Sequence, residues 1–196
     1  MTKGNDPQEQ ARIHLILNGQ ASKFAYFVER YQREIMAFIQ RMDVPPVEAE
    51  ELTQDTFVRA FRGLHDYEGK ASFCTWLLRI AHRVTLNHLK RKHLTVISFD
   101  DDNPRTTQAF LEADYSAALD DELDTALSTG REERIQLLEA AILKLPPDDQ
   151  LLLRLFYFEE QPLNDIAFIL EVSAGALSTR LHRLRQRLYR MIEEKK

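Results

Sequence analysis

The stretch FCTWLLRIAHRVTLNHLKRKH, residues 73–93, carries two large aromatic side chains, Phe73 and Trp76, at the start of a helical pattern and positive charge along the rest. On an α-helix, residues three or four positions apart share a face. Polar and aromatic side chains recur at that spacing: Trp76, Arg79, Arg83, Asn87, Lys90 and Arg91. The stretch therefore predicts a single helix with an aromatic end and a cationic side.

These residue types suit a single strand of nucleic acid. Cations bind the phosphates of paired and unpaired strands alike, whereas an aromatic ring gains about 1–3 kcal/mol of stacking energy only from a base whose face is free. We therefore expect the aromatic end to take bases and the cations to take the backbone. The competing interpretation places the aromatics in the core of a small domain. It is favoured for Phe73 and stays open for Trp76.

Helical periodicity also dominates the sequence before this stretch. Apolar residues from Phe24 to Met42 fall on one stripe, and the prolines of DVPP, residues 43–46, end that helix. A second helix is expected in residues 47–64, with an inner side formed by Ala49, Leu52, Phe57, Ala60, Phe61 and Leu64. Because nothing in the chain is typical of a β-sheet protein, we predict an all-α fold.

The chain changes character after residue 94. Residues 98–130 hold nine acidic residues and one arginine, including an Asp run and an Asn-Pro pair, and they lose the apolar stripe. Such a composition predicts a flexible linker. We therefore expect two small helical domains joined by an acidic linker. The predicted divisions are an N-terminal segment (1–19), a first domain (20–94), the linker (95–130) and a second domain (131–196).

The second domain ends in the pattern of a helix-turn-helix. A short apolar helix containing Ile166 and Ile169 precedes a turn near residues 171–173, and leucines recur every three or four residues beyond it. Val172 is expected to reach the core. In this motif the second helix enters the DNA major groove. Taken alone, the pattern fits a surface helix with solvated arginines equally well. The candidate DNA contacts are Gly175, Ser178, Thr179, Arg180, His182 and Arg183.

Composition excludes several classes of protein. The single cysteine, Cys74, cannot form an internal disulfide, and the polar N-terminus lacks the apolar stretch of a signal peptide. No apolar run approaches the roughly 20 residues of a membrane span, so we expect an intracellular, cytoplasmic chain. The net charge of −5 does not exclude nucleic acid, because the charge is unevenly distributed.

The sequence also argues against an enzyme. No Gly-rich phosphate loop and no nucleophile–base pair is visible, so we expect no catalytic residues, no cofactor and no small-molecule substrate. A metal site could be sought in four residues, but their spacing matches no zinc motif, so no metal is expected. These residues are Cys74, His82, His88 and His93.

Three motifs together carry a family resemblance. They are EELTQDTF (residues 50–57), YEGKASFCTWLLRIA (67–81) and GALSTRLHR (175–183). In this order and spacing the chain resembles a bacterial sigma factor of the extracytoplasmic-function group, over about residues 20–94 and 132–192. The resemblance implies an all-helical protein that binds core RNA polymerase and promoter DNA. It also implies an anti-sigma partner, which in this family is often membrane-anchored.

The resemblance assigns roles to individual residues. EELTQDTF resembles the helix that docks on the clamp helices of the largest polymerase subunit, which implicates Glu51, Leu52, Gln54 and Asp55. Residues 67–81 resemble the segment that captures and melts the −10 element, and GALSTRLHR resembles the −35 recognition helix. The linker resembles the connector that passes through the RNA path of the polymerase. The implied −10 contacts are Tyr67, Phe73, Thr75, Trp76, Arg79, Arg83, Asn87, Lys90 and Arg91.

The chain departs from the family pattern at Arg83 and Glu171, and also at Ala176 and Ser178, where the family often has Thr and a basic residue, so the −35 preference is expected to differ. The family often has Asn where this chain has Arg83, so preference within the −10 element is expected to differ. Gly is common in the family where Glu171 stands, and Glu is strained there if the turn requires a positive φ. The main alternative is a helix-turn-helix regulator that acts without polymerase. That alternative does not explain the aromatic–cationic helix or EELTQDTF.

Overall fold

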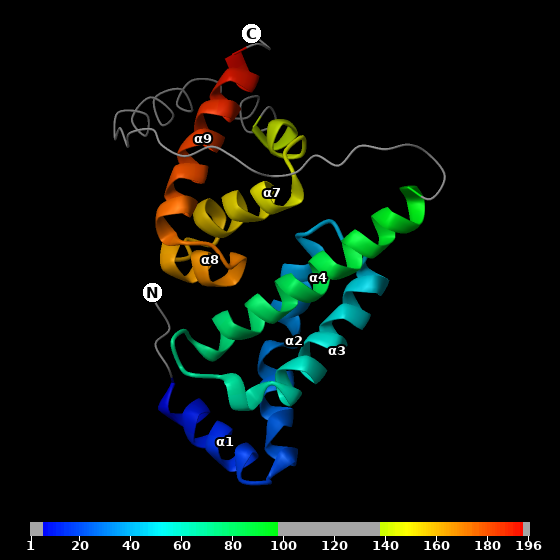
Figure 1. Ribbon diagram of the computed structural model, residues 1–196, viewed down its shortest axis with the longest axis vertical. Coiled ribbons are helices and arrows are strands. Elements are labelled where there is room, and N and C mark those ends of the chain that lie inside the picture. Colours follow the sequence, from blue (N-terminus) through cyan, green and yellow to red (C-terminus); the bar gives the residue numbers. More distant parts are fainter. Residues whose placement is uncertain (1–5, 98–137, 194–196) are drawn as a thin grey trace. The chain divides into compact units, whose positions relative to one another are not determined.

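The computed structural model describes residues 6–97 and 138–193, and every element within these ranges is a helix (Figure 1). The predicted all-α fold is therefore confirmed. Most of the acidic linker lies outside the described residues. The elements are α1 (Pro7–Leu17), η1 (Ala21–Phe24), α2 (Ala25–Gln40), α3 (Pro46–Arg62), η2 (Leu64–Asp66), α4 (Phe73–Ile97), α7 (Pro147–Leu153), η3 (Arg154–Phe158), α8 (Leu163–Leu170) and α9 (Ala174–Glu193).

The described helices group into two compact units. The first holds α1 to α4, with residues 164–172, which include most of α8, grouped with it, and the second holds α7, η3 and α9. In the first unit α2, α3 and α4 pack on one another around a core that contains Phe27, Ile35 and Leu77, each fully buried. The apolar stripe predicted for α2 thus forms the centre of this core. Phe61, expected on the inner side of α3, is 40% exposed instead.

The N-terminal segment, for which no helix was predicted, forms the helix α1. Asp6 caps it by accepting a hydrogen bond from the backbone N–H of Gln8 at 2.9 Å, and Pro7 occupies its first position. Both are ordinary helix-start signals. Its buried residues, Glu9, Ile13 and Ile16, share one face. A charged residue on that face hides the amphipathic pattern from a search for apolar periodicity.

The connection between α3 and α4 is a short structured loop. The phenol of Tyr67 donates a hydrogen bond to the carbonyl oxygen of Ala71 at 2.9 Å, which closes the loop across Gly69 at φ +69°. Ser72 then caps α4 by accepting from the backbone N–H of Thr75 at 3.1 Å. These bonds fix where α4 begins. α4 continues to Ile97, three residues past the predicted domain boundary at 94.

The second unit begins its described part with helical residues 138–142, and a pair of prolines, Pro146 and Pro147, then marks the start of α7. Leu151, Leu152 and Leu153 are all buried, as the strongly apolar sequence predicts. The helix does not continue unchanged: Arg154–Phe158 adopt the wider π form. Such segments occur often at functional sites.

The predicted turn after residue 170 is present between α8 and α9. Glu171 has φ +59°, so a glutamate occupies the left-handed conformation that favours glycine. The backbone N–H of Ala176 donates to the Ser173 hydroxyl at 3.2 Å and caps α9. The expectation for Val172 was wrong, since its side chain is 38% exposed. The leucine stripe of α9 is buried as predicted, at Leu177, Leu181, Leu184 and Leu188.

Candidate nucleic-acid interface

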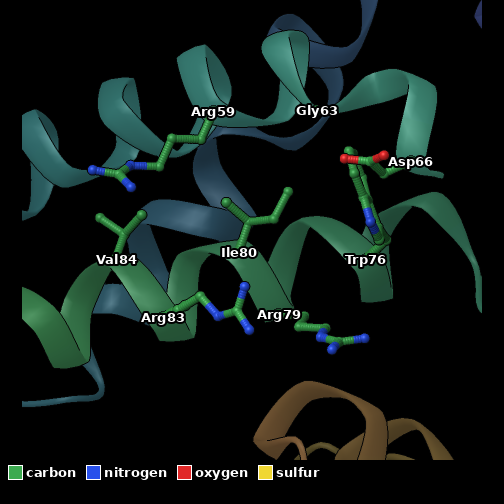
Figure 2. A pocket seen from close by; sticks show the side chains of 8 residues that line it. All are labelled: Arg59, Gly63, Asp66, Trp76, Arg79, Ile80, Arg83 and Val84. Carbon is green, nitrogen blue, oxygen red and sulfur yellow. The ribbon is translucent and has the colours of Figure 1, made fainter.

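A pocket of about 390 Å³ lies between α3 and the first half of α4. This volume falls in the range of roughly 300–1,000 Å³ that is usual for small-molecule sites. Figure 2 shows Arg59 extending from α3, Arg79 and Arg83 extending from α4, and Ile80 pointing toward α3 between them. The lining residues are Arg59, Gly63, Asp66, Trp76, Arg79, Ile80, Arg83 and Val84. Three of the predicted −10 residues, Trp76, Arg79 and Arg83, therefore share one cavity.

Trp76 stands at the edge of an aromatic cluster. Its ring centroid lies 5.3 Å from that of Tyr67 and 5.5 Å from that of Phe73. Trp76 is partly exposed and lines the pocket, whereas Phe73 is 1% exposed and packs on Phe27 with a centroid distance of 4.2 Å. The core interpretation favoured for Phe73 matches this burial. Trp76 has one side on the cluster and another open to the pocket.

Tyr67 and Thr75 are held by contacts within the protein. Burial, followed by the negative charge of Glu9, raises the pKa of Tyr67 to about 12, so its phenol is protonated at neutral pH and donates to Ala71. Thr75 is 6% exposed, and its hydroxyl lies 2.8 Å from that of Ser72. Phe73 and Thr75 are therefore both buried in the DNA-free chain, and their contact with DNA stays a prediction.

The polar residues in the second half of α4 differ in their contacts. Asn87, Lys90 and Arg91 are exposed. Lys92, part of the same basic run, instead bonds to Glu48 on α3 at 2.8 Å, beside His88 at 2.7 Å. Hydrogen bonds from Lys92 and then His88 lower the pKa of Glu48. This contact ties α4 to α3 and directs one lysine away from any strand along the helix.

The predicted polymerase-docking residues divide between surface and core. Glu51 and Gln54 are exposed on α3, and Asp55 is partly exposed, where its carboxylate accepts from Arg59 at 2.9 Å. Leu52 is 7% exposed, as expected for the inner side of α3, and its contact with polymerase stays a prediction.

Two valines on the same helix were not predicted as part of the docking face. Val47 is 83% exposed and Val58 is 46% exposed. They stand four residues before Glu51 and four residues after Gln54, so they flank the acidic and amide groups on one side of α3. They add exposed apolar area to the face of α3 that carries Glu51 and Gln54.

The start of α9 is partly committed to internal contacts. Arg180 donates to the Asp149 carboxylate from Nε and Nη2, each at 2.6 Å. The Thr179 hydroxyl bonds to the carbonyl oxygen of Gly175 at 3.1 Å, and His182 lies 3.2 Å from the Gln186 amide. Ser178 is partly exposed and Arg183 is exposed. Sequence spacing could not reveal that Arg180 has a carboxylate partner 31 residues upstream.

Three of the four residues considered for a metal site have side chains that the structure describes. Cys74 and His82 are buried at 8% and 5% exposure on α4, and His88 bonds to Glu48. In the described residues no group of three or more His, Cys, Asp or Glu side chains is arranged to hold a metal ion. Among the described helices, none combines the length and the apolar character needed to cross a membrane.

Comparison with known proteins matches both halves of the chain. Residues 27–95 match the family model of Sigma-70 region 2, and residues 135–188 match that of Sigma-70, region 4. The RNA polymerase sigma factor YlaC of Bacillus subtilis is 33% identical over 162 residues, covering 81% of this chain and 86% of YlaC. The RNA polymerase sigma-H factor of Pseudomonas aeruginosa is 28% identical, covering 95% and 94%. The ECF RNA polymerase sigma factor SigW of B. subtilis is 28% identical, covering 93% and 96%.

Solved structures support the same fold. CnrH, in a complex with the cytosolic domain of CnrY, aligns with a TM-score of 0.58 at 18% identity and covers 95% of this chain and 97% of the other. The sigma factor RpoE from Bartonella quintana, in a complex with NepR, aligns with a TM-score of 0.55 at 21% identity, covering 88% and 98%.

The all-helical fold and the paired region 2 and region 4 matches define the class of this protein. The chain belongs to the sigma-70 family of bacterial RNA polymerase and, within it, to the extracytoplasmic-function group. It is a transcription initiation factor associated with RNA polymerase. The resemblance stated from the sequence is confirmed, and the alternative of a regulator acting without polymerase is not favoured.

Proposed function

We propose that the pocket between α3 and α4 holds an unpaired base of the promoter −10 element while neighbouring arginines bind the backbone of the same strand. The observation that carries this proposal is the presence of Trp76 together with Arg59, Arg79 and Arg83 around one cavity. A stacked base hides its faces, so the exposed side of Trp76 has a partner only in a melted or flipped base. The arginines supply the charge that any phosphate requires.

The position of Asp66 indicates which end of the pocket would hold the base. Its carboxylate also lines the cavity, near Trp76 in the view of Figure 2. A carboxylate repels phosphate but accepts hydrogen bonds from the amino groups of bases. The end of the pocket that holds Trp76 and Asp66 therefore suits a base.

A gel-shift comparison tests the proposal. We expect this chain together with core polymerase to retain a promoter whose −10 region is already unpaired, and the chain alone to leave duplex promoter DNA unshifted. Firm binding of duplex DNA by the chain alone, with no gain from core polymerase, would instead favour a regulator that acts without polymerase.

We assign the −35 contacts to the exposed part of the α9 start, chiefly Arg183 with Ser178, and assign Arg180 to the internal pair with Asp149. Replacing Arg183 with alanine should weaken promoter binding by the holoenzyme and lower the salt slope by about one unit, because one phosphate contact is lost. Replacing Arg180 with alanine should leave that slope unchanged. It should lower the free energy of unfolding by about 1–2 kcal/mol, because Asp149 is 13% exposed and loses charge-assisted bonds.

Thermal unfolding and salt-dependent binding of the two variants, measured side by side, separate these roles. If Arg180→Ala leaves stability unchanged and lowers the salt slope as Arg183→Ala does, then Arg180 contacts DNA and our assignment is wrong.

We further propose that an anti-sigma protein holds this chain inactive. The support is the exposed apolar surface that a free chain presents, Phe158 at 66% exposure and Tyr157 at 43% in η3, together with the fact that the structurally similar RpoE is found in a complex with the anti-sigma factor NepR. We expect purification from uninduced native cells to recover a second protein with this chain. Recovery with polymerase alone under those conditions contradicts the proposal.

A further inference from the structure

The N-terminal helix α1 lies outside the region 2 match, which begins at residue 27. It nevertheless contributes a carboxylate to the interior of that domain. Glu9 is only 5% exposed, although glutamate is seldom buried unless it is paired. A charge placed in the interior carries a desolvation cost, so its partners and its position need an explanation.

The partners of Glu9 come from α2. The phenol of Tyr31 donates a hydrogen bond to Glu9 Oε1 at 2.5 Å, and Arg30 Nε lies 3.3 Å from the same oxygen. Tyr31 is itself 5% exposed, and burial, followed by its bond to Glu9, raises the pKa of this phenol. Tyr31 therefore stays protonated and remains a donor at any physiological pH. The result is a buried charge-assisted bond that joins α1 to α2.

Tyr31, which donates this bond, also contacts the aromatic cluster of the candidate interface. The ring centroid of Tyr31 lies 6.3 Å from that of Phe73, and Phe73 lies 5.4 Å from Tyr67 at an interplanar angle of 89°. Phe73 also lies 5.5 Å from Trp76. In addition, α1 packs directly against η2, the segment just before Tyr67. Two sets of contacts therefore connect α1 to the loop that adjoins Trp76: the ring contacts that begin at Tyr31, and the packing of α1 on η2.

We propose that α1 is part of the promoter-opening site and that Glu9 is its positioning residue. Through Tyr31 and Phe73, Glu9 sets the position of Tyr67 and Trp76 against an unpaired base. The pKa of Tyr67, raised in part by the charge of Glu9, is consistent with this proximity. This inference rests on the proposed role of Trp76 in strand opening.

The test uses Trp76 as its own reporter, because it is the single tryptophan of the chain. Glu9→Leu removes the acceptor, Tyr31→Phe removes only the donor hydroxyl, and Glu9→Gln keeps an acceptor at the same position. We expect the first two variants to shift the Trp76 emission maximum. Glu9→Gln should leave the maximum close to that of the wild type. Glu34→Leu, which removes an exposed acid three residues after Tyr31, is the matched control and should leave the emission unchanged.

The functional readout is permanganate reactivity of unpaired thymines in the full holoenzyme, on a promoter recovered with wild-type holoenzyme from a randomised library. Glu9→Leu and Tyr31→Phe should reduce strand opening by about tenfold, the scale of one weakened base stack. Core-polymerase affinity should stay within about twofold, since the bonds of Glu9 are made to Tyr31 and Arg30 of α2 and not to the docking residues of α3.

A double variant distinguishes positioning from mere loss of stability. If Glu9 acts through Trp76, then Tyr31→Phe combined with Trp76→Ala should open no less DNA than Trp76→Ala alone. Additive losses, or an unchanged Trp76 emission in both Glu9→Leu and Tyr31→Phe, overturn the inference. If Glu9→Leu does not fold, Tyr31→Phe keeps the ring in place and decides the question. Should Trp76→Ala itself open DNA normally, the proposed function of the pocket fails, whereas the emission shift still reports whether Glu9 positions the cluster.

Discussion

Replacing Trp76 with alanine should leave closed promoter complexes nearly intact and reduce strand opening by roughly 5- to 150-fold, the equivalent of about 1–3 kcal/mol for one base stack. The reason is geometric. Trp76 lines the pocket with one side and rests on Tyr67 and Phe73 with the other, so its free side can gain energy only after the duplex has opened. Permanganate reactivity of unpaired thymines measures the effect directly.

Two comparisons make the Trp76 result specific. A promoter already melted across the −10 region should restore the Trp76→Ala variant, because the energy of opening no longer has to be supplied. It should not restore Arg91→Ala, an exposed cation of α4 that is expected to lower affinity in both states. Trp76→Phe, which retains a smaller ring, should open DNA less than the wild type and more than Trp76→Ala. If Trp76→Ala loses the helical circular dichroism signal of the first unit, the core interpretation holds for Trp76 as it does for Phe73.

Replacing Asp55 with arginine should weaken binding of core polymerase by about thirtyfold, or about 2 kcal/mol. A polymerase surface that is complementary to an acidic side chain would then face a positive charge. Asp55 is partly exposed on α3 beside Glu51 and Gln54, and its bond to Arg59 is a surface pair that contributes little to stability. Pull-down of core polymerase measures the effect, and circular dichroism should show an unchanged fold.

The matched control for Asp55 is Glu68→Arg. Glu68 is an exposed acid of the loop before α4, so the variant reverses the same charge in the same domain but away from α3. It should bind core polymerase normally. Equal capture of wild type and Asp55→Arg would show that this face of α3 is not the docking surface.

The sequence predicted the helices and their apolar faces because periodicity is a local signal. The stripe of α2, the turn after residue 170 and the leucines of α9 were all visible in this way. Roles that depend on a distant partner were not visible. Arg180 has the spacing of a DNA contact but bonds to Asp149, and Glu9 looks like a solvated acid until Tyr31, 22 residues away, is found beside it.

The same limit applies within the opening stretch of sequence. Phe73 and Trp76 stand three residues apart on one helix, yet the first is 1% exposed and the second lines the pocket. Leu52 shows the same limit: it stands in a motif in which Glu51 and Gln54 are exposed, whereas its own side chain is 7% exposed. The missed helix α1 did carry a local signal, the Asp-Pro start at residues 6–7, but a buried glutamate interrupts its apolar face.

Run-off transcription with purified core polymerase over a promoter library tests the central claim most directly. If this chain is an initiation factor that opens the −10 element through the α3–α4 pocket, adding it to core polymerase yields discrete transcripts from a subset of promoters. The Trp76→Ala variant then yields few transcripts except from premelted templates. The absence of chain-dependent transcripts from any promoter, with duplex DNA bound by the chain alone, would contradict it.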